Sequence, residues 1–140
     1  MNFKELIIDV LQEKGKTIQD LVEDKVVVKN AIYEYEEFTP SLRNILNIAN
    51  YLQVSLDYIV GKSSENNFKK YKMEQNNFYN KFDSLLKEMQ ITKYKLRKDL
   101  HISNADFHRW KNGTTPMFST ILQIVEYLNC SIDDLLEFEE

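Results

Sequence analysis

The chain has 140 residues, of which 43% are hydrophobic and 12% aromatic, enough core material for one ordinary domain or two minimal ones of about 60 to 70 residues. Its three glycines and two prolines leave little for the turns of a sheet-rich fold, and its net charge of −4 argues against a protein that coats nucleic acid non-specifically. Charged residues interrupt the apolar runs from the N-terminus onward, so we expect no signal peptide, no membrane contact and a soluble, cytoplasmic protein.

The first half of the chain shows the three- to four-residue apolar spacing of short amphipathic helices. The first such stripe consists of Phe3, Ile7, Val10 and Leu11. The predicted helices span residues 2–14, 17–25, 28–36, 41–52 and 55–60. Thr17 and Ser55 stand directly before two of them, where a hydroxyl can accept a hydrogen bond from an amide of the first turn. We therefore predict that Thr17 and Ser55 are helix N-caps.

A small, polar segment at residues 61–67 follows this first set of helices and has the composition of a linker. Beyond it, residues recur every three or four positions in an aromatic stripe made of Phe68, Tyr71, Gln75, Phe78 and Phe82. Two interpretations are open: a helix that begins near Glu65 and packs this stripe on the first half, or a disordered tether with scattered aromatics. We assign residues 63–75 to a linker, which is partly helical in the first interpretation.

The second half carries five more predicted helices, at residues 76–89, 92–100, 103–111, 116–128 and 131–138. Their predicted N-caps are Thr92, Ser103 and Ser131. Trp110 follows Phe107 in the apolar phase, so we expect it to pin its helix to the core. Cys130 also lies in an apolar phase, and as the only cysteine it cannot form an internal disulfide, so we expect a buried structural thiol.

The two halves repeat each other in register. At an offset of 75 residues the first stripe aligns with Phe78, Phe82, Leu85 and Leu86, and the residues Thr17, Leu21, Ile32 and Tyr35 align with Thr92, Leu96, Phe107 and Trp110. From Pro40, which aligns with Pro116, the offset is 76, and a length difference of one residue is what a surface turn tolerates. The repeat predicts an all-α fold of two tandem five-helix domains, at residues 1–62 and 76–140.

Three segments of the second half, residues 91–103, 107–113 and 116–136, have the helix and turn pattern of a known DNA-binding family. They resemble the Xre-type or lambda-repressor-like (Cro-type) helix-turn-helix domains of phage repressors and bacterial regulators. The first half resembles the closing part of that pattern at residues 39–61, whereas its central part matches poorly. The resemblance therefore covers most of the chain outside the linker.

The resemblance implies a binding mode on double-stranded DNA. In this family the second helix rests across the phosphate backbone, and the third lies in the major groove with its N-terminal residues at the base edges. The residues that this mode directs toward bases are Asn104, Ala105, Asp106 and His108. The residues that it directs toward phosphates are Arg109, Asn112, Thr114 and the amide of Lys93, and Lys111 completes the expected DNA-binding set.

Asp106 stands out in this set because a carboxylate among phosphates is repelled. Three interpretations are open. Asp106 accepts a hydrogen bond from a cytosine, forms an intramolecular cap, or marks a helix that has exchanged DNA for another partner.

Local charge separates the two halves. Residues 91–113 hold six basic and two acidic residues, a local charge of +4, whereas the corresponding residues 16–38 hold three basic and six acidic ones, a local charge of −3. Because DNA affinity depends on basic groups that neutralise phosphates, we expect the second domain to bind DNA and the degenerate first domain to serve association or structure.

Departures from the family pattern affect the packing of the second and third helices. The family prefers a small residue in the middle of the second helix and glycine in the turn, where this chain has Arg97 and His101. The first half has Val22 and Val26 at these positions. Arg97 is expected to lay its stem over Trp110, and His101 must adopt a backbone conformation that favours glycine.

Other chemistries find no support in the sequence. Two histidines and one distant cysteine do not form a tetrahedral metal set, and no phosphate-binding loop or nucleophile motif occurs. We expect no cofactor, no metal and no enzymatic activity.

Two functions fit these observations. The first is a sequence-specific, repressor-like transcriptional regulator that reads DNA with its second repeat and works as a homodimer through the first repeat or the linker. The second is a helix-turn-helix fold converted to a protein-binding module, such as an antirepressor or an inhibitor of a nucleic-acid-binding protein, whose acidic first repeat contacts a basic partner. In a further alternative to the dimer, the two repeats pack on each other and the chain stays monomeric.

Overall fold

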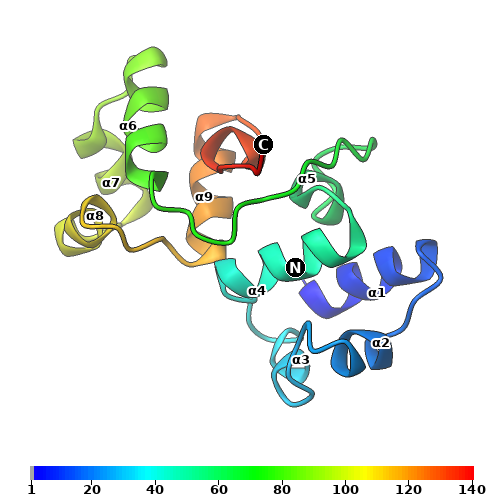
Figure 1. Cartoon of the computed structure of the whole chain (residues 1–140). Helices are drawn as coiled ribbons and strands as arrows, with labels where there is room; N and C mark the ends of the chain where they lie inside the picture. The colour runs from blue at the N-terminus through cyan, green and yellow to red at the C-terminus, as the bar shows by residue number, and fades with distance from the viewer. Residues whose placement is uncertain (1) are drawn as a thin grey trace. The chain divides into compact units, whose positions relative to one another are not determined.

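The computed structural model describes residues 2–140, and these contain α-helices, one 3₁₀ helix and no strand (Figure 1). The only bridge of sheet type within the described range joins Tyr71 to Phe138. The chain divides into two compact units. Unit 1 comprises residues 1–73 together with 138–140, and unit 2 comprises residues 74–137. Nowhere in residues 2–140 does a helix combine the length and apolar character needed to cross a membrane.

Unit 1 contains five helices. They are α1 (Phe3–Glu13), α2 (Ile18–Glu23), α3 (Ala31–Glu34), α4 (Leu42–Leu52) and α5 (Leu56–Ile59). Their apolar faces form a core in which Phe3, Ile7 and Ile45 are almost completely shielded from solvent. Side chains at Asn2, Thr17, Ser41 and Ser55 each accept a hydrogen bond from an amide of the following first turn. The predicted N-caps Thr17 and Ser55 are confirmed.

Unit 2 contains four α-helices and the 3₁₀ helix. They are α6 (Phe78–Glu88), α7 (Lys93–Leu100), α8 (Asn104–Lys111), α9 (Phe118–Leu128) and η1 (Ile132–Leu135). An aromatic cluster joins α6 to α8: the Trp110 ring lies 5.9 Å from Phe78 and 6.0 Å from Phe82, both edge-on, and 5.1 Å from Phe107. Trp110 is buried, as predicted, and so fixes α8 to the core. The predicted caps Thr92, Ser103 and Ser131 are confirmed.

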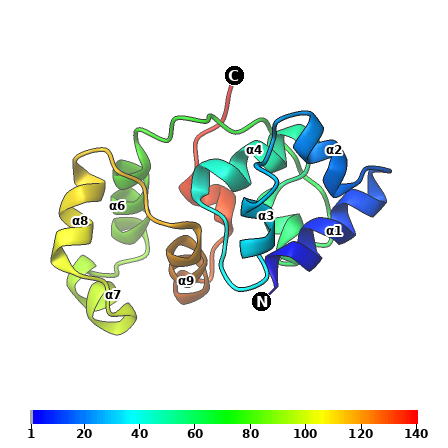
Figure 2. The same ribbon diagram turned by 90° about the horizontal axis from the view of Figure 1, so that it is seen from below.

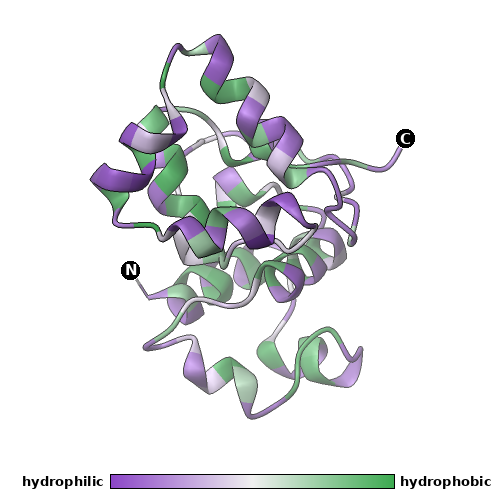
Figure 3. Ribbon diagram, turned by 90° about the vertical axis from the view of Figure 1, so that its left-hand side faces the viewer, coloured by the Kyte–Doolittle hydropathy of each residue, from purple (hydrophilic) through white to green (hydrophobic). Residues whose placement is uncertain are grey.

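The helices alternate polar and apolar segments along their length, as helices with one buried face do (Figure 3). In unit 2, α7 and α8 lie next to each other (Figure 2).

The observed helices are shorter than the predicted ones, and three of the differences have a clear physical cause. The segment predicted at 28–36 is a single turn, α3, because the β-branched run Val26 to Val28 and the turn after it do not enter a helix. The segment predicted at 17–25 ends at Glu23, since Lys25 adopts a left-handed conformation with φ 58°. The segment predicted at 131–138 is the 3₁₀ turn Ile132–Leu135, after which the chain becomes extended at Leu136.

The linker contains no helix, so the partly helical interpretation of residues 63–75 is wrong. The extended chain is instead bound to unit 1 by side chains. Asn50 receives a hydrogen bond from the Tyr71 N–H at 2.9 Å and donates one to the Tyr71 carbonyl at 3.0 Å, while the buried Tyr71 hydroxyl accepts from the Leu56 N–H at 2.8 Å. These contacts replace the backbone bonds that a helix would make, and they also contradict the disordered tether.

Cys130 differs from its prediction in burial. Its side chain is half-buried and not enclosed, because it follows Asn129, a left-handed residue (φ 53°) that ends α9 and turns the chain toward the surface.

Local features of the two units recur at the offsets of 75 and 76 residues. Left-handed conformations occur at Gly15 and Gln90, and again at Gln53 and Asn129. A tyrosine near the end of the fourth helix donates a hydrogen bond to an aspartate near the end of the second in both units, from Tyr51 to Asp24 and from Tyr127 to Asp99. The α1 and α6 bounds differ by 75 residues, and the bounds of α4 and α9 by 76.

Candidate nucleic-acid interface

A sharp turn joins α7 to α8. His101 ends α7 in a left-handed conformation (φ 57°, ψ 39°), and the N–H of the next residue, Ile102, donates to the Arg97 carbonyl at 2.9 Å. Ile102 is buried, which anchors the turn to the core. Ser103 then starts α8, and its hydroxyl accepts from the Asp106 N–H at 3.0 Å. The two helices are therefore held by a compact turn in which histidine occupies a glycine-favouring position.

The buried residues of α8 determine which of its side chains face solvent. Phe107 and Trp110 point into the core. Residues on the other side of the helix, among them Asn104, Ala105 and His108, are exposed. Helical periodicity thus turns the N-terminal part of α8 outward, as a helix that enters a DNA groove requires.

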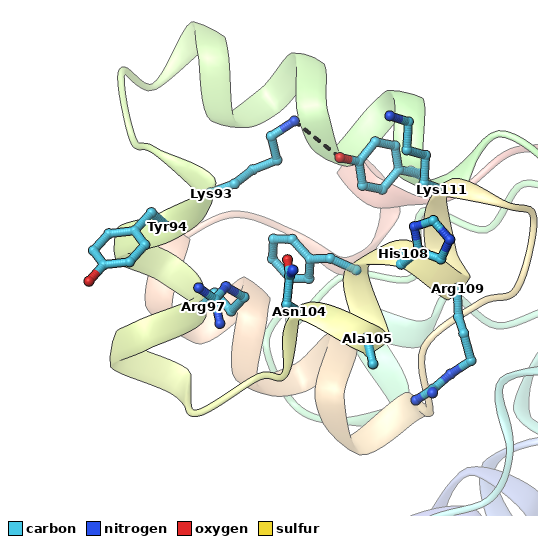
Figure 4. Close-up of a pocket in the computed structure, with 10 residues that line it drawn as sticks. Lys93, Tyr94, Arg97, Asn104, Ala105, His108, Arg109 and Lys111 are labelled. Carbon is cyan, nitrogen blue, oxygen red and sulfur yellow. Dashed lines mark hydrogen bonds between the residues drawn. The ribbon is translucent and has the colours of Figure 1, made fainter.

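An open groove of about 830 Å³ lies along α7 and α8 (Figure 4). Its lining consists of Tyr79, Lys93, Tyr94, Arg97, Asn104, Ala105, Phe107, His108, Arg109 and Lys111. Four of these side chains are cationic and none is a carboxylate. Such a groove attracts an anionic partner and offers it amide, imidazole and guanidinium donors.

Six predicted site residues line this groove, namely Lys93, Asn104, Ala105, His108, Arg109 and Lys111. Asp106, Asn112 and Thr114 do not line it. Asn112 ends α8, and its amide group donates to the His108 carbonyl at 3.0 Å. The Thr114 N–H donates to the Arg109 carbonyl at 3.0 Å. Asn112 and Thr114 therefore close the C-terminal end of α8.

The side chain of Lys93 is tied to α6. Its ammonium group lies 2.9 Å from an Asp83 carboxylate oxygen and donates to the Tyr79 hydroxyl at 3.1 Å. The hydrogen bonds from Lys93 and Lys87 lower the pKa of Asp83, and the bond to Asp83 raises the pKa of Lys93. This pair leaves the backbone at the start of α7 open, which is the part of Lys93 that was expected to face phosphate.

Arg97 and Tyr94 are groove residues that sequence reasoning missed. The Arg97 guanidinium lies 5.7 Å from the centre of the Tyr94 ring, an aromatic partner that was not named from the sequence. The physical reason is helical spacing: Tyr94 is three residues away on the same face of α7, whereas Trp110 is enclosed by Phe78, Phe82 and Phe107. Tyr94 is 64% exposed, and its position two residues after the Thr92 cap was a signal for outward placement.

Asp106 pairs with Arg109, one turn further along the same helix. The N-cap of α8 is made by the Ser103 hydroxyl, so the interpretation of Asp106 as an intramolecular cap is wrong. The other two interpretations, a cytosine contact and a different partner, stay predictions. The spacing of three residues between Asp106 and Arg109, which allows an ion pair on one face of a helix, is visible in the sequence.

The corresponding region of unit 1 is built differently. α3 has four residues, and the side chains around it include Glu34, Glu36 and Glu37. Glu36 is bound by Lys4 at 2.8 Å, and the same ammonium lies 4.6 Å from the centre of the Tyr33 ring. The local surface is acidic and aromatic, without a two-turn helix that a major groove would accept.

No set of three metal-ligating side chains is placed to hold an ion in the described part of the chain. The geometry of unit 2, a capped helix, a sharp turn and a second helix whose N-terminal half faces outward over a cationic groove, defines a helix-turn-helix domain of the nucleic-acid-binding class.

The comparison with protein families agrees with this class. Residues 81–140 match the model of the Cro/C1-type HTH DNA-binding domain, which supports the resemblance to the Cro-type family for this part of the chain and in general terms indicates a DNA-binding regulator. The match begins within α6 and does not extend into residues 1–80. No curated protein and no solved structure gave a significant match.

Proposed function

We propose that the protein is a sequence-specific DNA-binding transcriptional regulator of repressor type that reads double-stranded DNA with unit 2. The observation that carries the proposal is the groove along α7 and α8, which is lined by four cationic side chains and no carboxylate in a segment that matches a DNA-binding family. A regulator of this type acts by occupying its DNA site.

The proposed docking places α8 in the major groove and the start of α7 at the phosphate backbone. Asn104 and His108 then face base edges, where an asparagine amide can bond both edge atoms of an adenine. Arg97, Lys111 and the backbone amides at Lys93 face phosphates, and they supply affinity without sequence information.

A binding selection from random duplexes, with affinities then measured by fluorescence anisotropy over a range of salt, tests the proposal. We expect an enriched sequence, and affinity that falls steeply with salt. Lys111→Ala should weaken binding to all duplexes and reduce the salt slope by about 1, whereas Asn104→Ala should relax the preference at one base pair at a cost of about 1–3 kcal/mol.

The matched control is Lys29→Ala, which removes an exposed positive charge from unit 1 and should leave the affinity unchanged. If the full chain bound no duplex at low salt, or if Lys29→Ala acted like Lys111→Ala, the assignment of DNA binding to unit 2 would be contradicted. A chain without DNA binding would favour the alternative of a protein-binding module.

We further propose that the two units are tandem copies of one Xre-type fold, with domains at residues 1–62 and 76–140. The support is the recurrence of helix bounds, left-handed residues and the tyrosine–aspartate bond at two nearly equal offsets. In this interpretation unit 1 has kept its core and lost its recognition helix. Its acidic surface repels DNA, so it serves association with a second copy of the chain or with another protein.

The association that we propose is a homodimer formed through unit 1. Three large apolar side chains, those of Val28, Tyr33 and Phe38, are more than half exposed there at 72%, 58% and 66%. Monomeric proteins seldom leave such residues together in one short segment.

A further inference from the structure

Asp106 is the only carboxylate on α8, the helix that the proposed function places in the major groove. Its side chain pairs with Arg109, which lines the cationic groove, while Asp106 itself stays outside the lining. The other ion pairs of the basic segment bind Lys93 and Lys95, which lie on α7. The pair on α8 is thus the one that touches the recognition helix.

We infer that Asp106 acts as an electrostatic brake on DNA binding, an inference that rests on the proposed function. By holding Arg109, it lowers the affinity of unit 2 for duplexes of every sequence. The brake acts on the sequence-independent part of the affinity and leaves the base contacts of α8 unchanged.

The cap of α8 does not need the carboxylate of Asp106. The cap is formed by the Ser103 hydroxyl, which accepts from the backbone N–H of Asp106, so the side chain at position 106 takes no part in it. Asp106 is half-buried and its partner Arg109 is exposed, so neither fills the core. The carboxylate therefore acts through its charge, on Arg109 and on the first turn of α8.

The charge of Asp106 acts twice against DNA. It cancels the positive charge of Arg109 within the pair, and it repels the phosphates that approach α8. Specificity is the ratio of affinities for the preferred site and for the many other sequences, so an equal loss of sequence-independent affinity leaves this ratio unchanged and lowers the occupancy of all sequences.

The test is the Asp106→Asn variant of the full chain, which keeps the side-chain shape and removes the charge. Affinities are measured by fluorescence anisotropy for the duplex returned by selection and for a scrambled duplex, between about 50 and 200 mM salt. We expect tighter binding of both duplexes, by about three- to tenfold, and a salt slope steeper by about 0.9, the value for one additional phosphate contact.

Two further variants test whether the gain in affinity comes from the release of Arg109. Glu126→Gln changes the net charge equally on an exposed position of α9 outside the groove, and it should raise the affinity much less. In an Arg109→Ala background most of the gain from Asp106→Asn should disappear, because the residue that the brake holds is missing. Circular dichroism of each variant verifies that the fold is intact.

Several outcomes would overturn the brake. Unchanged affinity of Asp106→Asn would show that the pair has no effect on binding. Weaker binding of the selected duplex with a changed preference at one base pair would show that Asp106 reads a base. An equal gain in the Arg109→Ala background would show that Arg109 is not the residue held. If neither the wild-type chain nor Asp106→Asn bound duplex DNA, the proposed function would be overturned together with the brake. If the wild-type chain bound DNA and any of the first three outcomes occurred, only the brake would be overturned.

Discussion

Trp110 and Tyr35 occupy positions 75 residues apart, one in each unit, and both rings are buried. Trp110 packs on three phenylalanine rings of unit 2. The hydroxyl of Tyr35 is buried without a hydrogen-bond partner among the described residues, and burial raises its pKa more than the nearby Asn44 amide lowers it. Trp110 therefore stabilises unit 2 by packing, whereas the buried hydroxyl of Tyr35 lowers the stability of unit 1.

Trp110→Ala should lower the free energy of unfolding by about 3–5 kcal/mol, the range for emptying a buried aromatic site. Because Trp110 fixes α8 to α6, DNA affinity should fall with stability. Thermal unfolding followed by circular dichroism measures the loss, and Trp110→Phe, which retains most of the ring contacts, should cost much less. A melting temperature equal to that of the wild type would show that the ring is not part of the core.

Tyr35→Phe should raise the free energy of unfolding by about 1 kcal/mol, since it removes a buried hydroxyl that has no partner. The matched control is Tyr71→Phe, where the lost hydroxyl accepts a hydrogen bond from the Leu56 N–H at 2.8 Å, and we expect destabilisation by about 1–2 kcal/mol. Urea unfolding of both variants tests the contrast, and equal effects of the same sign would refute it.

At the scale of elements, the turn between α7 and α8 carries a conformational cost. His101 adopts φ 57°, a region that glycine enters without strain and other residues enter at a cost. His101→Gly should therefore stabilise unit 2 by roughly 0.5–1 kcal/mol, and His101→Ala should destabilise it. The order of melting temperatures, glycine above histidine above alanine, is the measurable result. A glycine variant that melts no higher than the wild type would mean that the histidine is not strained there.

The ion pair between α6 and α7 makes stability depend on pH. The hydrogen bonds from Lys93 and Lys87 lower the pKa of Asp83 below its ordinary value of 3.8, so the folded state binds fewer protons than the unfolded state just below that pH. The stabilisation is complete above pH 3.8 and is lost as the pH falls through the lowered pKa. Asp83→Asn should thus be less stable than the wild type at pH 7, by about 0.2–1 kcal/mol.

Urea unfolding followed by the fluorescence of Trp110, the only tryptophan, measures this effect. The difference between Asp83→Asn and the wild type should shrink toward zero at pH 2 to 3. The control Glu126→Gln removes an exposed carboxylate without an ion pair and should show no such difference. A difference that persisted unchanged at low pH would assign the effect to something other than the carboxylate charge.

Elements with a strong apolar stripe were predictable from the sequence. α1, α4, α6 and α9 begin and end within two residues of the predicted bounds, because the spacing of the buried residues is a local property of the sequence. α3 and the linker were not predictable. α3 shortens in a β-branched and acidic segment, and the linker is fixed by Asn50 and Tyr71, which are 21 residues apart in the chain.

The candidate site also has features that were predictable from the sequence and features that were not. Asn104, Ala105 and His108 were expected at the base edges because of the resemblance to a DNA-binding family, and in the structure they line the groove. The contact between the Arg97 guanidinium and Tyr94 was missed, although the spacing of three residues on α7 allows it, and the enclosure of Trp110 by rings of α6 is a tertiary effect that spacing does not reveal.

At the scale of the whole molecule, charge and exposed apolar surface are divided between the units. Unit 2 holds the cationic groove, and unit 1 holds the acidic segment with Val28, Tyr33 and Phe38 exposed. A single recognition helix covers only half of a two-fold site, so sequence-specific binding by one groove per chain gains greatly from a second copy. This division of surfaces leads to our prediction of the oligomeric state.

We predict that the chain is a dimer at micromolar concentration and that Tyr33→Ser with Phe38→Ser converts it to a monomer, because the apolar surface that drives association is removed. Light scattering measures the mass. The matched control is Met117→Ser, which removes an apolar side chain that is 65% exposed in unit 2 and should leave the mass of two chains unchanged. The double variant should also bind the selected duplex more weakly, while its affinity for a single half-site stays that of the wild type. A wild-type mass of one chain, unchanged when a palindromic duplex is added, would contradict the dimer and leave a monomeric reader of DNA.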